Sequence, residues 1–349
     1  MIDSSDISVV IQGAIIPKII KKVTKSIRKN LPNAEIIIST WKETPLYGLD
    51  FDKIVLNKNV KAIPFRKNGQ LHNLNRQIFS TFNGIKKAER KYILKIRSDI
   101  MLLNTNFLNY FDKFNVRKEK YRVFEKRILI TNIYTRNSSN KLRALFHPSD
   151  WMMFGLASDM YKMWNIPLAK EPETSQWYTT HKKPKKDMFP DFLTRYHAEQ
   201  YIWINALKTN GINVSFNNYS SYSSKLCKIS EQTIFNNFVV LDYLPKFSFL
   251  NLKYPYIEMD DTVISFYDWL KYYKNNFNIS FKIPFIEIVK NELNLKTNLL
   301  KFKKHFKRIF FPVNKILNWA NEIFSTLFYI IKIPIDIVLK SWKYFVLKQ

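Results

Sequence analysis

The stretch KYILKIRSDIMLL, residues 91–103, decides the fold class. Its first half, Lys91–Ile96, is typical of a buried β-strand, and three consecutive polar residues, Arg97, Ser98 and Asp99, then interrupt the apolar run. In open α/β sheets, ligands bind outside the carboxyl ends of the strands. The polar break is therefore expected to lie where the core of a sheet meets a charged ligand.

The chain before this stretch alternates between strand and helix patterns. ISVVIQG, residues 7–13, and EIIIS, residues 35–39, are continuous β-branched runs of the kind found in parallel sheets with both faces covered. Lys18–Asn30 lies between them, with apolar residues at helical spacing and basic residues on the other face. This β-α-β unit predicts an α/β fold with a right-handed crossover.

The same pattern continues along the chain and predicts one domain over residues 1–260, with a mainly parallel sheet flanked by helices. Further strands are expected at residues 52–56, 126–134, 211–216 and 238–243, and helices at residues 73–89 and 194–208. Residues 170–191 are rich in proline and lysine without periodicity, which indicates a long loop or lid. Four lysines of this loop are candidates for contacting phosphates of a ligand: Lys182, Lys183, Lys185 and Lys186.

Residues 261–349 are expected to form a basic, amphipathic helical C-terminal region. Lysines dominate from residue 301 onward, beside faces rich in Phe and Trp, as in helices that lie in a membrane interface. The alternative is a basic helical pair that closes the domain or makes an oligomer contact. No stretch approaches the roughly 20 apolar residues that span a bilayer.

Composition limits the partners and the compartment. The formal charge of +28 makes a polyanion the expected partner: nucleic acid, an anionic membrane or a phosphorylated small molecule. The one cysteine, Cys227, excludes an internal disulfide framework and a cysteine-based metal site. The N-terminus lacks the basic segment followed by an apolar segment that is typical of a secretory signal. We therefore expect a cytoplasmic protein, peripheral at the inner face of the cytoplasmic membrane.

Several common catalytic motifs do not occur. The sequence has no G-x-x-x-x-G-K-[ST], G-x-G-x-x-G, G-x-S-x-G or H-E-x-x-H, which argues against P-loop, dinucleotide-binding, serine hydrolase and zincin chemistry.

Asp99 has two interpretations. It could hold a divalent cation that bridges nucleotide phosphates, or it could cap the segment that follows.

Four motifs taken together resemble the WavE lipopolysaccharide synthesis family of glycosyltransferases. They lie at residues 75–88 (N-R-Q-I-x-S-T-x-x-G-I-x-x-A), 92–100 (YILKIRSDI), 146–155 (FHPSDWMMFG) and 198–201 (AEQY). The resemblance covers roughly residues 7–208. It implies a GT-A-like (Rossmann-like) fold and transfer of a sugar from a nucleotide-sugar donor to a glycan or glycolipid acceptor, such as lipopolysaccharide, lipooligosaccharide or capsule.

The resemblance also implies where the donor binds. Gln12 and Gly13 would line the nucleotide pocket, and Thr40 and Trp41 would contact the base or ribose, Trp41 by stacking. A core tryptophan is the alternative for Trp41. Two residues of the predicted helix would reach the pyrophosphate or ribose, with the guanidinium pairing phosphate oxygens: Asn75 and Arg76.

The metal site implied by the resemblance departs from the family pattern. GT-A enzymes are expected to carry D-x-D, whereas Arg97 stands at the position of the first acid. Either Asp99 holds Mn²⁺ or Mg²⁺ with one protein carboxylate, with His147 as a further ligand, or Arg97 replaces part of the cation's charge and no metal is needed. The expectation is a divalent cation at Asp99.

Two carboxylates are candidates for the general base that takes the acceptor's proton: Glu199 and Asp150. A helix first-turn acid is the alternative for Glu199. Ser149 and Asp150 would orient sugar hydroxyls, or would instead cap a proline-containing turn. The base, sugar, acceptor and stereochemical outcome stay open.

A second class of function also fits the composition. Many aromatic residues are interleaved with lysines, as in proteins that stack single-stranded nucleic acid in a basic groove. The polar residues at the strand ends, however, are mixed in sign and clustered at one edge. A non-catalytic nucleic-acid-binding protein is therefore the alternative to the transferase.

Overall fold

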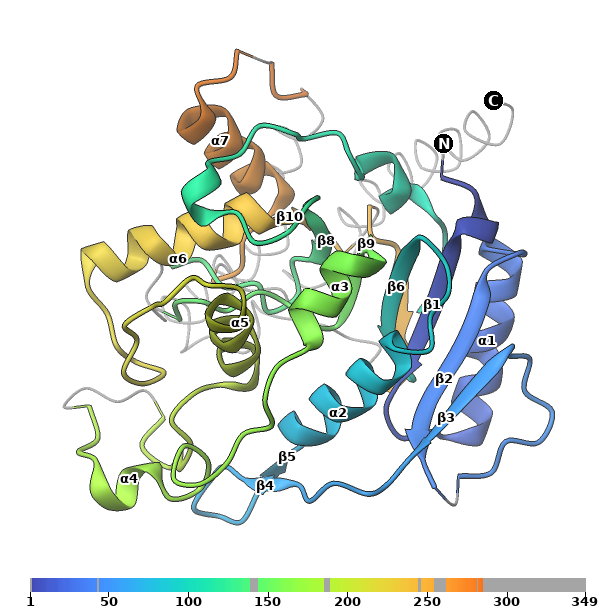
Figure 1. The fold of residues 1–349 in the computed structure, drawn as a ribbon, viewed down its shortest axis with the longest axis horizontal. Helices are drawn as coiled ribbons and strands as arrows, with labels where there is room; N and C mark the ends of the chain where they lie inside the picture. Colours follow the sequence, from blue (N-terminus) through green and yellow to red (C-terminus); the bar gives the residue numbers. More distant parts are fainter. Residues whose placement is uncertain are drawn as a thin grey trace, which may run out of the picture. The chain divides into compact units, whose positions relative to one another are not determined.

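The computed structural model describes residues 2–42, 44–138, 144–184, 189–243, 246–253, 262–280 and 282–284 (Figure 1). All of them belong to the first of two compact units, Met1–Val289. The second unit, Lys290–Gln349, lies outside the described residues. Most of the predicted C-terminal helical region therefore lies outside them as well, and its membrane association stays a prediction.

A seven-stranded sheet forms the centre of the described part, in the order β10-β8-β9-β6-β1-β2-β3. Every neighbouring pair is parallel except those of β9, which runs antiparallel to both β6 and β8. The seven strands are β1 (Ile7–Gln12), β2 (Glu35–Trp41), β3 (Lys53–Asn57), β6 (Tyr92–Arg97), β8 (Ile128–Thr131), β9 (Met152–Leu156) and β10 (Phe238–Leu241). This mostly parallel sheet confirms the predicted GT-A-like α/β class.

Two small antiparallel pairs accompany the central sheet. β4 (Ile63–Pro64) pairs with β5 (Leu71–His72), and β7 (Ile100–Leu102) pairs with β11 (Phe249–Asn251). β7 follows the polar break at residues 97–99, so the chain re-enters sheet structure directly after it.

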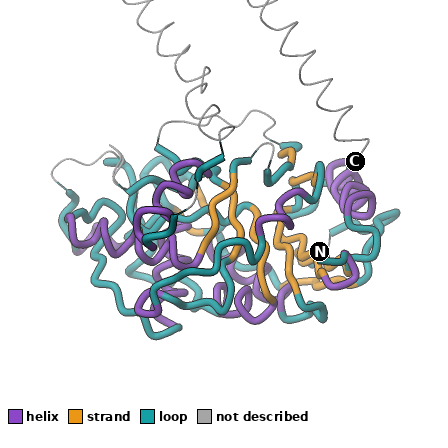
Figure 2. The backbone as a smooth tube through the Cα atoms, turned by 90° about the horizontal axis from the view of Figure 1, so that it is seen from above, coloured by secondary structure: helices purple, strands orange, loops and turns teal. Residues whose placement is uncertain are grey.

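Helices cover both faces of the central sheet. α1 and α2 lie on opposite faces of β1 and β2 (Figure 1), and the view from above shows the strands between helices on either side (Figure 2). The helices are α1 (Pro17–Asn30), α2 (Leu74–Ile85), α3 (Ala157–Trp164), α4 (Trp177–Thr180), α5 (Ala198–Thr209), α6 (Ser224–Asn237) and α7 (Phe266–Phe277). Short 3-10 helices lie at Ser4–Asp6, Asn106–Tyr110 and Glu119–Tyr121.

α7 lies within the predicted C-terminal region and packs on the sheet. Its Trp269 is fully buried, and the indole N–H donates to the Phe238 carbonyl of β10 at 2.9 Å. The division of the chain at residue 260 stays a prediction, because most of the residues after α7 lie outside the described part.

One predicted strand is wrong. Gly211–Phe216 forms no strand and pairs with none among the described residues. Its alternation of buried Val214 and Phe216 with exposed neighbours arises from packing on the core, and the Phe216 carbonyl accepts from the Tyr196 hydroxyl at 2.6 Å. A side chain thus supplies a hydrogen bond that a neighbouring strand would otherwise supply.

α2 packs against β1 and β2 through a glycine. A Cβ at Gly84 would come within 2.5 Å of Val10 Cγ1 and 3.1 Å of Ser39 Cβ. We expect Gly84→Ala to lower the free energy of unfolding by about 1–3 kcal/mol, because this overpacking outweighs the better helix propensity of alanine. Chemical denaturation measures this loss of unfolding free energy. Gly155→Ala is the comparison, since a Cβ at Gly155 would come no closer than 3.0 Å to a neighbouring atom. A larger loss of unfolding free energy in Gly155→Ala than in Gly84→Ala would contradict this packing argument.

Candidate active site

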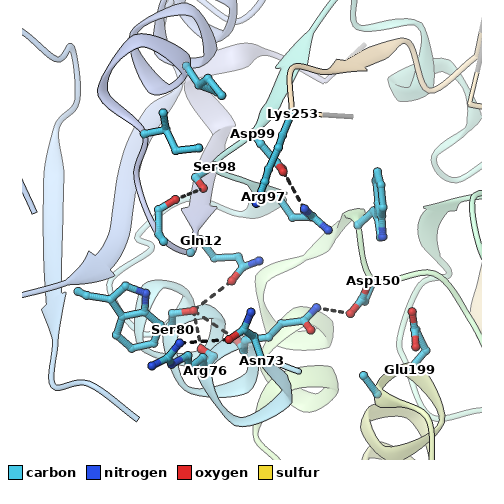
Figure 3. A pocket seen from close by; sticks show the side chains of 18 residues that line it. Gln12, Asn73, Arg76, Ser80, Arg97, Ser98, Asp99, Asp150, Glu199 and Lys253 are labelled. Carbon is cyan, nitrogen blue, oxygen red and sulfur yellow. Dashed lines mark hydrogen bonds and ion pairs between the residues drawn. The ribbon is translucent and has the colours of Figure 1, made fainter. Parts of the chain in front are cut away.

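The carboxyl ends of three parallel strands meet at one edge of the sheet. Gln12 of β1 is in register with Ser39 of β2 on one side and with Arg97 of β6 on the other. A cavity of about 340 Å³ lies at this edge (Figure 3). The cavity therefore lies at the edge of the sheet where strand-end placement predicts a site.

Eight of the twelve predicted site residues line this cavity: Gln12, Gly13, Trp41, Arg76, Arg97, Asp99, Asp150 and Glu199. Four do not belong to its described lining: Thr40, Asn75, His147 and Ser149. Of the loop lysines, Lys182 and Lys183 are also absent from the described lining, and Lys185 and Lys186 lie outside the described residues.

All four residues outside the lining have partners in the structure, and those of His147 are described with Glu199 below. The Asn75 amide donates to the Ala169 carbonyl at 2.9 Å and accepts from the Ala169 N–H at 2.7 Å, so it ties α2 to the chain before the loop. Thr40 is fully buried, with its hydroxyl 3.4 Å from that of Thr44. Ser149 is fully buried and accepts from the Trp151 N–H at 3.4 Å, which agrees with the turn alternative.

One end of the cavity combines an aromatic ring with a fixed guanidinium. Trp41 is half-buried at the end of β2. Arg76 donates through Nε to the Val60 carbonyl at 2.7 Å and through Nη2 to Asn59 at 3.1 Å. These bonds fix the guanidinium of Arg76, which lines the cavity (Figure 3). A stacking ring beside a guanidinium suits a base or ribose joined to phosphate.

The glycine after β1 is required by its backbone. Gly13 has φ of +112°, a conformation that other residues rarely adopt, and a Cβ there would lie 3.6 Å from Ser98 Oγ. Next to it, the Gln12 side chain accepts from the Ser80 hydroxyl at 3.1 Å. Gly13 lines the cavity, and the close approach of a ligand to its backbone stays a prediction.

Arg97 and Asp99 form a bidentate ion pair. Arg97 Nε lies 2.9 Å from Asp99 Oδ1, and Nη2 lies 2.7 Å from Oδ2. The guanidinium also lies 4.5 Å from the centre of the Trp151 ring. Both carboxylate oxygens of Asp99 thus accept from Arg97, and a neighbouring arginine supplies positive charge at the end of β6.

The predicted cation does not fit this arrangement of donors. The oxygens of Asp99 are directed to Arg97, and His147 contacts Glu199 instead of Asp99. Within the described part of the chain, no three His, Cys, Asp or Glu side chains gather as they would around a metal ion. The geometry agrees with the alternative in which Arg97 contributes the charge, and the divalent cation stays a prediction.

The other end of the cavity holds two carboxylates. Glu199 lies in the first turn of α5, its side chain 19% exposed, and His147 Nε2 is 3.5 Å from its Oε2. Burial raises the pKa of the Glu199 carboxyl above its usual value, with His147 opposing the rise and Asp150 adding to it. Asp150 accepts through Oδ2 from the Gln77 amide. A carboxylate with a raised pKa beside a histidine is suited to proton transfer near neutral pH.

The backbone around His147 is strained. His147 Nδ1 lies 2.9 Å from the carbonyl of Tyr134, and both Tyr134 and Phe146 have positive φ, 59° and 54°. Bulky residues rarely adopt this conformation, and such strain is often found at functional sites. The hydrogen bond to Tyr134 fixes the imidazole ring with Nε2 directed to Glu199.

A comparison with known families bears on this site. The family model described as WavE lipopolysaccharide synthesis matches residues 7–301. The chain belongs to this family. The match includes every predicted site residue and extends well past residue 208, where the motif resemblance ends. WavE membership indicates a role in lipopolysaccharide synthesis. No curated protein matches the chain.

Sequence reasoning missed several cavity residues of this WavE protein. Asn73, which precedes α2, and Gln77 and Ser80 within it lie at helical spacing from Arg76, and this spacing could have found them. Trp151 and Lys253 also line the cavity, and Lys253 follows β11, far along the chain, with no motif to mark it. Among the described residues, no helix is long and apolar enough to cross a membrane.

Proposed function

We propose that this chain is a glycosyltransferase that moves a sugar from a nucleotide-sugar donor to a bacterial surface glycan, which would be lipopolysaccharide, lipooligosaccharide or capsule. The observation that carries the proposal is one cavity with two different ends. Trp41 and Arg76 line the aromatic and cationic end, Asp150 and Glu199 line the acidic end, and Arg97, paired with Asp99, lies between them (Figure 3). Family membership and the GT-A-like sheet support the same reaction class.

The cationic end would bind the leaving group. Trp41 would stack on the base, and Arg76 would pair with phosphate oxygens. Arg97 lies at the end of the central strand β6, next to the acidic end, where the sugar–phosphate bond would be placed. Its positive charge would stabilise the charge that develops on the departing phosphate.

The acidic end would activate the acceptor. In a direct displacement, Glu199 takes the proton of the acceptor hydroxyl as that oxygen bonds to the anomeric carbon. The bond between this carbon and the phosphate oxygen breaks, and its electron pair leaves with the nucleoside phosphate. As an imidazolium, His147, 3.5 Å from Glu199, would stabilise the carboxylate before transfer, and Asp150 would hold sugar hydroxyls.

Binding of nucleotides to the native protein tests the donor half. UDP, GDP and CMP would each be added in a thermal-shift assay, with and without Mn²⁺. A nucleotide at 100 times its Kd is expected to stabilise the protein by about 2.7 kcal/mol, because it binds the folded state only. Arg76→Met should remove most of the shift, and Arg90→Met, exposed and outside the described lining, should retain it.

The result also separates the proposal from the alternative. No shift with any nucleotide, together with salt-dependent binding of oligonucleotides, would favour a nucleic-acid-binding protein instead. The mixture of Asp99, Asp150 and Glu199 with cationic residues in one cavity favours a small phosphorylated ligand over a nucleic acid.

A further inference from the structure

A lysine lies in the middle of the central sheet, two residues before Arg97 of the cavity lining. Lys95 belongs to β6, is paired with Val10 of β1 and Met153 of β9, and its side chain is fully buried. Nζ donates to the main-chain carbonyl of Asp150 and lies 5.0 Å from the centre of the Trp164 ring of α3. The ammonium therefore reaches the segment that carries a candidate catalytic carboxylate.

This position is costly for a lysine. A buried ammonium loses its hydration, and one carbonyl and one indole face replace only part of it. Methionine has a similar volume and would fill the same space in the core without this cost. A charge retained in the core of a sheet, next to a site, is therefore a candidate for a role in function.

The contacts of Asp150 indicate what that role is. Its carboxylate accepts from Gln77 of α2, and its carbonyl accepts from Lys95 of β6, so the residue is held at both its side chain and its main chain. Trp151, which follows it, packs against the Arg97 guanidinium. Arg97 is two residues after Lys95 on the same strand and so faces the same side of the sheet.

We propose that Lys95 is a positioning residue for sugar transfer: its buried ammonium holds the main chain at Asp150, and through it the Asp150 carboxylate and Trp151, in the catalytic arrangement. This inference rests on the proposed function. It assigns to Lys95 no contact with the substrate and no part in binding the nucleotide.

The charge of Lys95 titrates near the working pH of most enzymes. Burial lowers the pKa of the Lys95 ammonium to about 8, and Asp150, Arg97 and Asp99 are the charged groups that act on it. Trp164, which contributes the packing from α3, carries no charge. As the pH rises through about 8, the ammonium loses its proton, the hydrogen bond to Asp150 weakens, and turnover should fall.

The test compares Lys95→Met and Lys95→Arg with Lys91→Met, which removes an exposed lysine just before the same strand. Lys95→Met is expected to lower kcat roughly 100-fold, as small displacements of catalytic groups do. The donor KM, the nucleotide thermal shift and Tm should change little. Lys95→Arg should recover part of kcat, and the alkaline fall in turnover near pH 8 should be absent from both Lys95 variants.

The outcomes separate this inference from the proposed function. If the wild type turns over and Lys95→Met has the same kcat, the role of Lys95 is overturned and the proposed function is not. Absence of wild-type turnover with every nucleotide sugar would overturn the proposed function and this inference together. If Lys95→Met fails to fold, Lys95→Arg decides, because an arginine does not titrate in this range and an unchanged alkaline fall would contradict the proposal.

Discussion

Glu199→Gln is expected to lower the rate of sugar transfer by about 10³-fold, because glutamine keeps the shape of the side chain but cannot accept the acceptor's proton. Glu199 is the stronger candidate for the base because its pKa is raised by burial and His147 is directed to it. Initial rates with a nucleotide sugar and a glycan acceptor measure the loss. Nucleotide thermal shifts should match those of the wild type.

Two comparisons make this test specific. Glu89→Gln is the matched control, since the Glu89 side chain is 75% exposed and lies outside the described lining, and its rate should equal that of the wild type. Asp150→Asn tests the rival base. A smaller loss in Glu199→Gln than in Asp150→Asn would transfer the role of base to Asp150.

Arg97→Met is expected to reduce both stability and activity. It leaves the carboxylate of Asp99, 9% exposed, without its bidentate partner. The expected loss is about 2 kcal/mol of unfolding free energy, smaller than for a fully buried pair because Arg97 itself is 28% exposed. Turnover should fall about 100-fold, since the charge that faces the leaving phosphate is lost.

The double variant Arg97→Met with Asp99→Asn separates the two effects. It removes the unpaired charge, so unfolding by urea should show most of the stability regained, while turnover should stay low. If turnover returned with stability, Arg97 would act only by supporting the fold.

The same turnover assay in excess EDTA bears on the predicted cation. Turnover that persists agrees with an arginine in place of the cation, and complete loss of turnover that Mn²⁺ restores would support the cation at Asp99.

The strands and the position of the cavity could be predicted because their signals are local. β1, β2 and β6 are continuous apolar runs, and strand-end placement then locates residues 97–99 at the edge of the sheet where the cavity lies. α6 was not predicted, because its buried face carries polar residues such as Asn236 and Asn237, so that no apolar period marks it.

The pairings within the site could not be predicted, because they depend on side-chain geometry and on distant segments. The sequence marks Arg97 as a departure from D-x-D, but only the structure shows that it occupies both oxygens of Asp99. Asn75 lies beside Arg76 in the same motif, yet it turns to the backbone of Ala169, 94 residues away. In the sequence Lys95 is one polar residue within an apolar strand, and its partner Asp150 lies 55 residues further along the chain.

The antiparallel strand β9 links the folding of the core to the assembly of the site. It begins at the edge where the parallel strands end, so Asp150 and Trp151 enter the sheet beside the residues that leave β6. A slip of one residue in the Ile96–Met152 register would turn every side chain of β9 to the opposite face of the sheet. It would also shift Asp150 by about 3.3 Å along the direction of β6, away from its contact with Lys95. A misregistered molecule would therefore be inactive as well as poorly packed, and recovery of activity during refolding should report when β9 has paired correctly.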